Sequence, residues 1–186
     1  MKPLKLFTQI LAIFALMSCQ TMKSSDPYDS PQSTIPTGSM IELLQTLDFV
    51  PGFSRAFIQS GQPRTYAEVD QRLPYCQFYR YEPSSALQTL RTLQPDLFKV
   101  TASSQTMELG TTGVSIFASI GSNSRRNRDK DDYLLSSVLK LSSDLQPEIV
   151  ELKCAVLDES DHWNFLSVNQ IKATLGELVT ITLPEQ

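Results

Sequence analysis

The chain has 186 residues, of which 41% are hydrophobic, and its formal net charge at pH 7 is −4. This length allows one domain with its own core but hardly two. The acidic balance argues against a nucleic-acid partner, which needs a basic protein surface. The sequence contains no P-loop, dinucleotide fingerprint, EF-hand or zinc-ligand spacing, so it predicts neither a cofactor nor a metal site.

The N-terminus resembles a bacterial lipoprotein signal. Two lysines precede an apolar run over Leu6–Leu16, and the small Ser18 stands directly before Cys19. The run is shorter than the roughly 20 apolar residues of a membrane span. An ordinary cleaved signal more often ends in an Ala-x-Ala-like site. We therefore expect residues 1–18 to be a lipoprotein signal peptide and Cys19 to be the lipidated residue.

The lipoprotein resemblance implies fatty-acyl chains such as palmitate on Cys19, and several chains anchor far more firmly than one. In Gram-negative lipoproteins, Asp after the lipidated cysteine favours retention at the inner membrane, and this chain has Gln20 there. An outer-membrane anchor with the domain facing the periplasm is therefore expected. Cleavage removes two lysines and no acids, so the net charge moves from −4 to about −6.

Residues 19–37 are expected to be a flexible tether, and residues 38–186 a single β-rich periplasmic domain. The tether is rich in Ser, Asp and Pro and has too few large apolar side chains to form a core. If it were fully polyproline-like, at roughly 3.1 Å per residue, it would reach about 50 Å. It would let the domain stand off the membrane.

Apolar side chains of the domain recur mostly with a period of two, which indicates strands. The first two stretches meet at Val50–Phe53, where Pro51 presets φ and Gly52 tolerates a positive φ, so a type II turn is expected. The side chains expected on one face are Ile41, Leu43, Leu47 and Phe49 before the turn, and Phe53, Arg55 and Phe57 after it.

Further strands are expected between turn-rich spacers, whereas Ala86–Leu93 suits a helical turn or a strand. Short strands at this spacing favour a mainly β (α+β) domain, built as an antiparallel barrel or sandwich. The expected strands cover Tyr75–Tyr81, Leu97–Thr101, Val114–Ile120, Tyr133–Leu141, Glu148–Leu157 and Leu178–Leu183.

One short C-terminal helix is expected over Val168–Leu175. Ser167 and Gln170 have the spacing of a capping box. Gly176 supplies a left-handed residue after the last turn. A hydrophobic staple is also expected at the start of the helix, formed by Leu166 and Ile171.

Two cysteines, Cys76 and Cys154, remain once Cys19 is lipidated. An even pair in an exported chain usually forms a disulfide. We expect the bridge to join the middle of the sheet to its C-terminal part, with a stabilisation of about 4 kcal/mol in the loop-entropy model. The alternative is a redox pair or metal site, but no Cys-x-x-Cys spacing or nearby His supports it.

The only histidine, His162, follows the polar segment Asp158–Asp161. A lone His beside acids is usually solvated, and the functional alternative is a base that activates Ser160 or another hydroxyl. No Gly-x-Ser-x-Gly elbow is present. We predict no catalytic residue. A small cell-envelope hydrolase that uses His162 and nearby carboxylates remains the second hypothesis.

Two other groups of charged residues can each be interpreted either as solvated surface or as a functional site. The carboxylate pairs Glu68 with Asp70 and Asp158 with Asp161 usually solubilise a surface, although such pairs also serve acid–base chemistry. The basic residues within 125–130 lie among aspartates and indicate a solvated loop. Contact with anionic lipid heads is the functional alternative for them.

Several segments resemble a group of uncharacterised proteobacterial outer-membrane lipoproteins. These segments are Phe53–Gln59, Tyr66–Cys76, Pro95–Phe98 and Leu175–Gly176. The resemblance implies a lipid-anchored envelope protein and supplies no activity that can be carried over.

Arg55 is the candidate binding residue, because it is a charged group within an aromatic strand. An outward-facing arginine that packs through its stem is the alternative. Tyr75, Tyr79 and Tyr81 are expected on one strand face with Gln77, where they would line a groove or serve cross-strand packing. The sequence thus predicts a non-enzymatic outer-membrane lipoprotein that binds or supports an envelope protein or glycan.

Overall fold

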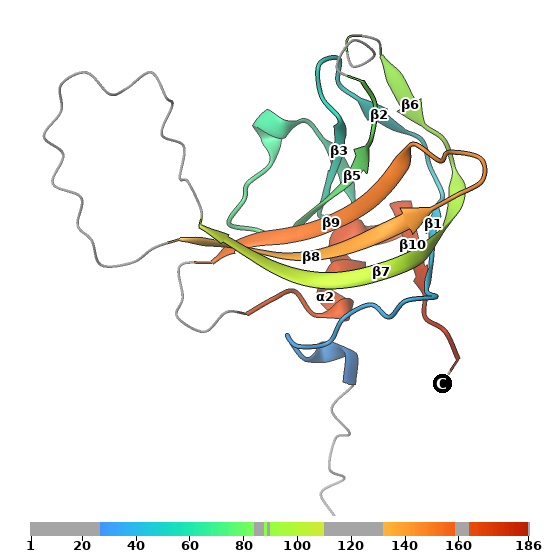
Figure 1. Ribbon diagram of the computed structural model, residues 1–186. Helices are drawn as coiled ribbons and strands as arrows, with labels where there is room; N and C mark the ends of the chain where they lie inside the picture. Colours follow the sequence, from blue (N-terminus) through green and yellow to red (C-terminus); the bar gives the residue numbers. More distant parts are fainter. Residues whose placement is uncertain (1–26, 84–87, 89, 110–131, 159–163, 186) are drawn as a thin grey trace, which may run out of the picture.

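The computed structural model describes residues 27–83, 88, 90–109, 132–158 and 164–185, and it confirms a mainly β domain with a short C-terminal helix. Eight strands form one antiparallel sheet in the order β10-β1-β7-β8-β9-β5-β3-β4, which curls like half a barrel (Figure 1). The strands of this sheet are β1 (Met40–Leu43), β3 (Arg55–Gln59), β4 (Gln62–Arg64), β5 (Tyr75–Arg80), β7 (Asp96–Leu109), β8 (Tyr133–Ser142), β9 (Ile149–Asp158) and β10 (Val179–Thr182).

The other elements are short. Strands β2 (Leu47–Phe49) and β6 (Arg91–Leu93) pair with each other in a second, two-stranded sheet. The helices are α2 (Val168–Leu175) and the 3-10 turns η2 (Pro27–Asp29), η3 (Tyr66–Glu68) and η5 (Gly176–Leu178). In the described ranges, every helix is too short or too polar to cross a membrane.

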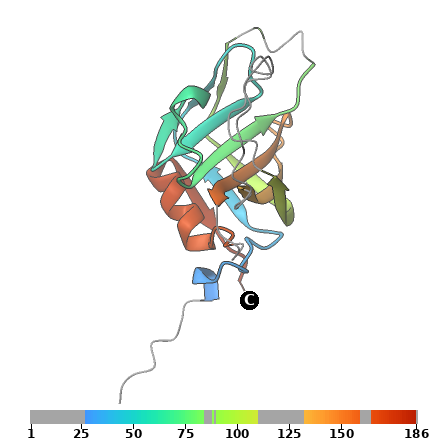
Figure 2. The same cartoon turned by 90° about the vertical axis from the view of Figure 1, so that its left-hand side faces the viewer.

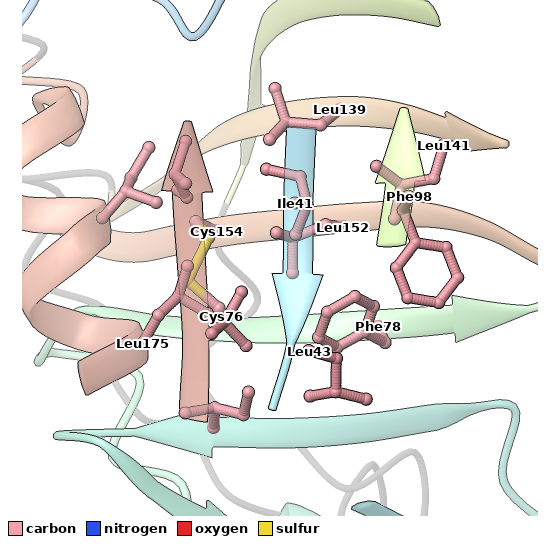
Figure 3. Close-up of a cluster of buried hydrophobic side chains, with 14 of the residues drawn as sticks. Ile41, Leu43, Cys76, Phe78, Phe98, Leu139, Leu141, Leu152, Cys154 and Leu175 are labelled. Carbon is pink, nitrogen blue, oxygen red and sulfur yellow. A yellow bond between two sulfur atoms is a disulfide. The ribbon is translucent and has the colours of Figure 1, made fainter. Parts of the chain in front are cut away.

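The main core, here called the inner cluster, lies on the concave face of the curled sheet. Side chains alternate between the two faces of a strand, so most strands send every second buried residue into this core, whereas all residues of β4 are exposed. Figure 3 shows aliphatic, aromatic and sulfur-bearing side chains from several strands and from α2 converging there. The residues labelled in it are Ile41, Leu43, Cys76, Phe78, Phe98, Leu139, Leu141, Leu152, Cys154 and Leu175.

The stretch expected to be one strand from Ile41 to Phe49 is two strands. β1 belongs to the large sheet and β2 to the small one, so the prediction of a single extended stretch is wrong. After β1 the backbone N–H of Leu44 donates to the carbonyl of Leu178 at 2.9 Å, and the chain then leaves the sheet. The four apolar side chains expected on one face are all buried, because the two sheets share the inner cluster.

The turn that follows β2 has the expected form. The N–H of Phe53 donates to the carbonyl of Val50 at 3.0 Å, and Gly52 has a φ of 86°. A positive φ at the third position of such a turn favours glycine.

Two other strand predictions need correction. β7 continues to Leu109 instead of ending at Thr101, because its polar second half pairs with β8 over its whole length. β4 was not expected, because it contains Pro63 and has no apolar alternation. Of the ambiguous segment Ala86–Leu93, the last three residues form β6. The strand expected over Val114–Ile120 lies outside the described residues.

The helix prediction is confirmed at both ends. α2 spans Val168–Leu175, and the N–H of Gln170 donates to the Ser167 hydroxyl at 3.2 Å while the Gln170 side chain accepts from the Ser167 N–H at 2.9 Å. Both staple residues, Leu166 and Ile171, are buried in the inner cluster. Gly176 has a φ of 59° but a ψ of −140°, so it has the expected positive φ without the left-handed helical conformation.

The turn of the β3–β4 hairpin packs against the C-terminal end of α2. Its two-residue turn has positive φ at both Ser60 and Gly61, which matches the twist of the flanking strands. The N–H of Gly61 donates to the carbonyl of Thr174 at 2.9 Å. A Cβ on Gly176 would lie 2.6 Å from the Cα of Gly61, so the two backbones can approach this closely only because both residues are glycines.

The segment just before residue 38 packs against the domain. Ile35 is buried in the inner cluster, and Tyr28 packs against it. The Asn169 side chain donates to the Asp29 carboxylate at 2.8 Å. The folded domain therefore extends N-terminal to the boundary expected at residue 38, back to η2.

Candidate functional site

The outer face of the sheet carries a pocket of about 230 Å³ beside Arg55, here called the Arg55 pocket. It forms where the turn between β2 and β3, the outer side of β3, and the segment from β4 to η3 come together. Its lining residues are Asp48, Val50, Phe53, Arg55, Phe57, Arg64, Thr65, Tyr66 and Ala67. The candidate binding residue therefore lies in a hollow of the surface.

Aromatic rings form much of the wall of the Arg55 pocket. Phe57 is buried, whereas Phe53 is 45% exposed and Tyr66 is 53% exposed. The Tyr66 ring lies 6.4 Å from that of Phe53 and 5.8 Å from that of Phe57, measured between centroids. These separations are typical of aromatic pairs in contact. The pocket thus presents two large exposed rings above a buried one.

Two exposed guanidinium groups, Arg55 and Arg64, also line the pocket, and neither forms an ion pair within the part of the chain that the structure describes. The nearby carboxylates have other donors. Asp48 accepts from the Thr92 hydroxyl at 2.8 Å. Glu68 accepts from the N–H and the hydroxyl of Thr65 at 2.8 and 2.9 Å. The two arginines therefore keep their hydrogen-bond donors available to a ligand.

One wall of the pocket belongs to the segment 65–74, here called the flap. The flap covers a second, smaller apolar cluster on the outer face, here called the outer cluster, which consists of Phe57, Tyr75 and Ala155 with Val69 and Leu134 packed against them. The hydrogen bonds from the Thr65 backbone and side chain lower the pKa of Glu68, with a smaller contribution from Arg64. A charged Glu68 therefore stabilises the first turn of the flap.

A buried amide, Gln59, fixes the flap to β3. Its side-chain nitrogen donates to the carbonyl of Asp70 at 2.8 Å and lies 3.3 Å from those of Leu73 and Pro74. Its side-chain oxygen accepts from the N–H of Asp70 at 3.1 Å. One side chain thus satisfies several backbone groups of an irregular segment, which is how a loop without its own ladder keeps a defined position.

The tyrosines expected to share a groove are separated. Tyr75 is buried in the outer cluster beneath the flap, and Tyr81 follows the end of β5 and is 71% exposed. The pairing of β5 with β9 shifts register between Tyr79 and Arg80, and Tyr81 lies beyond the end of β5. Burial raises the pKa of Tyr75, and the positive charge of Arg55 partly offsets this rise. Tyr75 therefore serves packing, and the groove lined by all three tyrosines is not formed.

The structure joins Cys76 and Cys154 in a disulfide, as the even cysteine count predicted. The two residues are direct register partners on the neighbouring strands β5 and β9, and their Cα atoms are 4.0 Å apart. Both are buried in the inner cluster (Figure 3). Their burial in a packed core suits a structural bridge.

Several predicted site residues lie outside the described residues. These are Cys19, His162 with Ser160 and Asp161, and the basic residues within 125–130. Of the carboxylate pairs, Glu68 and Asp70 have different partners, because Asp70 accepts from the N–H of Arg72 at 3.0 Å. Within the described ranges, no three His, Cys, Asp or Glu side chains gather as metal ligands.

A buried cation, Arg80, was not singled out from the sequence. Its side chain is 2% exposed, its guanidinium carbon lies 4.6 Å from the centre of the Phe49 ring, and Nη2 lies 3.4 Å from Oε2 of Glu82. The cation–π contact with Phe49 connects β5 to β2, whereas the ion pair with Glu82 joins Arg80 to the residues that follow β5. The alternation of β5 places it on the inner face, but only the three-dimensional structure shows that Phe49 lies beside it.

The sequence analysis also missed Arg64 and Tyr66 as site residues. Thr65 and Glu68 have the spacing of a capping box, so this signal could have revealed the start of the flap. Nothing in the sequence could have shown that this turn lies beside Phe53, because their contact depends on how β3 and β4 pair.

Comparison with known proteins finds no matching family model, no matching curated protein and no matching solved structure. The resemblance to proteobacterial lipoproteins therefore stays a prediction. Function has to be argued from the geometry of the Arg55 pocket.

Proposed function

We propose that the protein is a non-enzymatic, lipid-anchored envelope protein that binds a partner through the Arg55 pocket. The observation that carries this proposal is that Arg55 lines the same hollow of the surface as two exposed aromatic rings, Phe53 and Tyr66. Binding hot spots are enriched in arginine and aromatic residues and cluster around such hollows. Single exposed apolar side chains are common on protein surfaces, whereas adjacent exposed ones such as Phe53 and Tyr66 are typical of interaction sites.

The proposed anchor is Cys19 in the outer membrane, with the domain facing the periplasm. In Figure 1, η2, where the described chain begins, lies at the bottom of the domain, whereas β2 and β3 lie in its upper part. Figure 2, turned by 90°, shows η2 at the same lower end of the domain. This arrangement supports an orientation in which the Arg55 pocket points away from the anchoring membrane.

The anchor has a test of its own. Cys19→Ala should remove acyl label from the chain and release it from the outer-membrane fraction. Equal labelling of the wild type and the variant would contradict the proposed anchor and leave the binding proposal to be judged separately.

Photo-crosslinking in cells tests the binding function. A photoreactive amino acid replaces Ala67, which lines the pocket, in the full anchored chain, and a matched chain carries it at the exposed Leu97 on β7. We expect one discrete adduct from position 67, absent from position 97 and strongly reduced by Arg55→Glu. His162→Ala should leave the adduct and the cellular role unchanged.

Two outcomes would contradict the proposal. The first is an absence of any Arg55-dependent adduct from position 67. The second is a loss of cellular role in His162→Ala with folding, lipidation and adduct formation intact, which would favour the envelope hydrolase.

A further inference from the structure

The Arg55 pocket joins two unpaired cations to exposed aromatic rings, and this combination specifies the chemistry of an occupant. Building on the proposed binding function, we infer that the pocket receives a polypeptide segment of a partner protein that inserts one aromatic side chain and places a carboxylate beside it. Four features of the pocket carry this inference.

The first feature is size. The pocket measures about 230 Å³, whereas pockets that enclose drug-sized ligands measure about 300–1,000 Å³. A volume below that range suits one large side chain. Single side chains that fill such a pocket are the usual anchors of a protein–protein contact.

The second feature is the aromatic wall. Phe53 and Tyr66 have substantial exposed surface, and their planes are inclined by 30°. An aromatic side chain placed against them gains offset or edge-to-face contacts that an aliphatic chain lacks, worth about 0.5–1.5 kcal/mol per pair.

The third feature is charge. Asp48 and Glu68 already accept hydrogen bonds from Thr92 and Thr65, respectively. Arg55 and Arg64 keep free donors in forked geometry, which matches a carboxylate. The lining holds two arginines against one carboxylate, Asp48, so the pocket has an excess of positive charge on a chain whose net charge is −4. An acidic partner segment would be repelled elsewhere and attracted here.

The fourth feature is the neighbouring sheet edge. β4 is the edge strand beside the pocket, and Pro63 in its centre has no N–H to donate to an added strand. Recognition of a peptide at this edge therefore depends on its side chains. β2 and β3, which contribute to the pocket lining, lie at the opposite end of the domain from η2 (Figure 1), and this disfavours lipid of the proposed anchoring membrane as the occupant.

Binding of labelled peptides tests the inference with the full lipidated chain in phosphatidylcholine nanodiscs. Three dye-labelled heptapeptides carry Asp-Phe-Asp, Asn-Phe-Asn or Asp-Ala-Asp between Gly-Ser ends, and fluorescence anisotropy gives each Kd. We expect the Asp-Phe-Asp peptide to bind at least about tenfold more tightly than the other two. Binding of the two Asp-bearing peptides should weaken steeply as salt screens the arginines, whereas binding of the Asn-Phe-Asn peptide should change little.

Three variants sharpen the test. Arg55→Gln should weaken binding of the Asp-Phe-Asp peptide about tenfold. Lys99→Gln, which removes an exposed cation from β7 far along the sheet order, should leave it unchanged. Ala67→Trp should block the peptide by filling the pocket while preserving the charges. All three sites are exposed, so folding is expected to persist.

Equal affinities for the three peptides, or an Arg55→Gln chain that binds like the wild type, would overturn the inference. Arg55-dependent binding to phosphatidylglycerol vesicles without any peptide preference would also overturn it and assign the site to a lipid. If the adduct from position 67 still depends on Arg55 in those cases, the proposed function stands and only the occupant is wrong.

Discussion

The two faces of β3, β5 and β9 are both apolar near the disulfide, yet they are built differently. On the inner face, Ile58, Cys76 and Cys154 join a cluster that extends through many strands to α2. On the outer face, Phe57 and Tyr75 belong to a cluster of a few residues under the flap. The same strands thus carry the main core on one face and the outer cluster on the other, and Phe57 of β3 also lines the Arg55 pocket.

This difference suggests a division of stability between the faces. The inner cluster is held by the paired strands of the large sheet, by the disulfide and by α2. The flap has one short 3-10 turn and depends on the hydrogen bonds of Gln59. Segments with few buried contacts open locally at lower free energy than the core, and binding regions are often drawn from them. We therefore expect substitutions on the two faces to have different effects.

The largest contrast should come from two phenylalanines. Phe78 is fully buried in the inner cluster, so Phe78→Ala should lower the free energy of unfolding by about 3–5 kcal/mol. Phe53→Ala, on the exposed wall of the pocket, should cost less than about 1 kcal/mol and reduce partner binding. Urea unfolding with the disulfide intact measures both. Similar losses of stability would remove the proposed division between the faces.

A smaller effect is expected where the flap is attached. Gln59→Leu removes the donor and acceptor that satisfy the flap backbone, at a cost of about 1–3 kcal/mol. Hydrogen exchange should quicken in the flap and remain slow in β5 and β9. Gln62→Leu, at an exposed position of β4, is the matched control and should leave exchange unchanged. Faster exchange throughout the sheet would show that the flap is part of one cooperative core.

The smallest effect concerns the ionisation of Tyr75. Burial raises the pKa of Tyr75 above its ordinary value of 10.0, and the charge of Arg55 partly offsets the rise. The stability contributed by the protonated phenol is therefore fully present below pH 10 and is lost as the pH rises through the folded-state pKa. A difference titration of tyrosine absorbance between the wild type and Tyr75→Phe isolates this group.

Arg55→Gln should move that titration to still higher pH, because the substitution removes the offsetting charge. A titration of Tyr75 at or below pH 10 would contradict burial as the dominant influence on its pKa. A titration that Arg55→Gln leaves in place would show that Arg55 does not act on the outer cluster.

Local sequence signals predicted the parts of the fold that depend on neighbouring residues. The capping box at Ser167 located α2, and alternation of apolar side chains located β5, β8 and β9 approximately. The second half of β7 was not predicted, because its polar residues show no apolar alternation. It is a strand only because it pairs with β8.

The candidate site was only partly predictable for the same reason. Arg55 was predicted as a binding residue because it is a charged residue in an aromatic strand. The alternation of that strand also predicted that Arg55 and Phe57 share a face. Arg64 and Tyr66 joined it only because the β3–β4 hairpin brings the start of the flap back over β3. Such a contact between separate segments is decided by tertiary pairing, which no short sequence window contains.

The cross-strand position of the disulfide has a consequence for assembly of the sheet. Cys76 and Cys154 are register partners, so a slip of β9 by one residue would turn Cys154 to the opposite face of the sheet from Cys76. Oxidation can then seal only an alignment in which Lys153 already lies opposite Gln77 and Leu152 opposite Phe78. The disulfide therefore forms only after β5 and β9 have paired in the correct register, and it then fixes that register, although the two cysteines lie 78 residues apart in the chain.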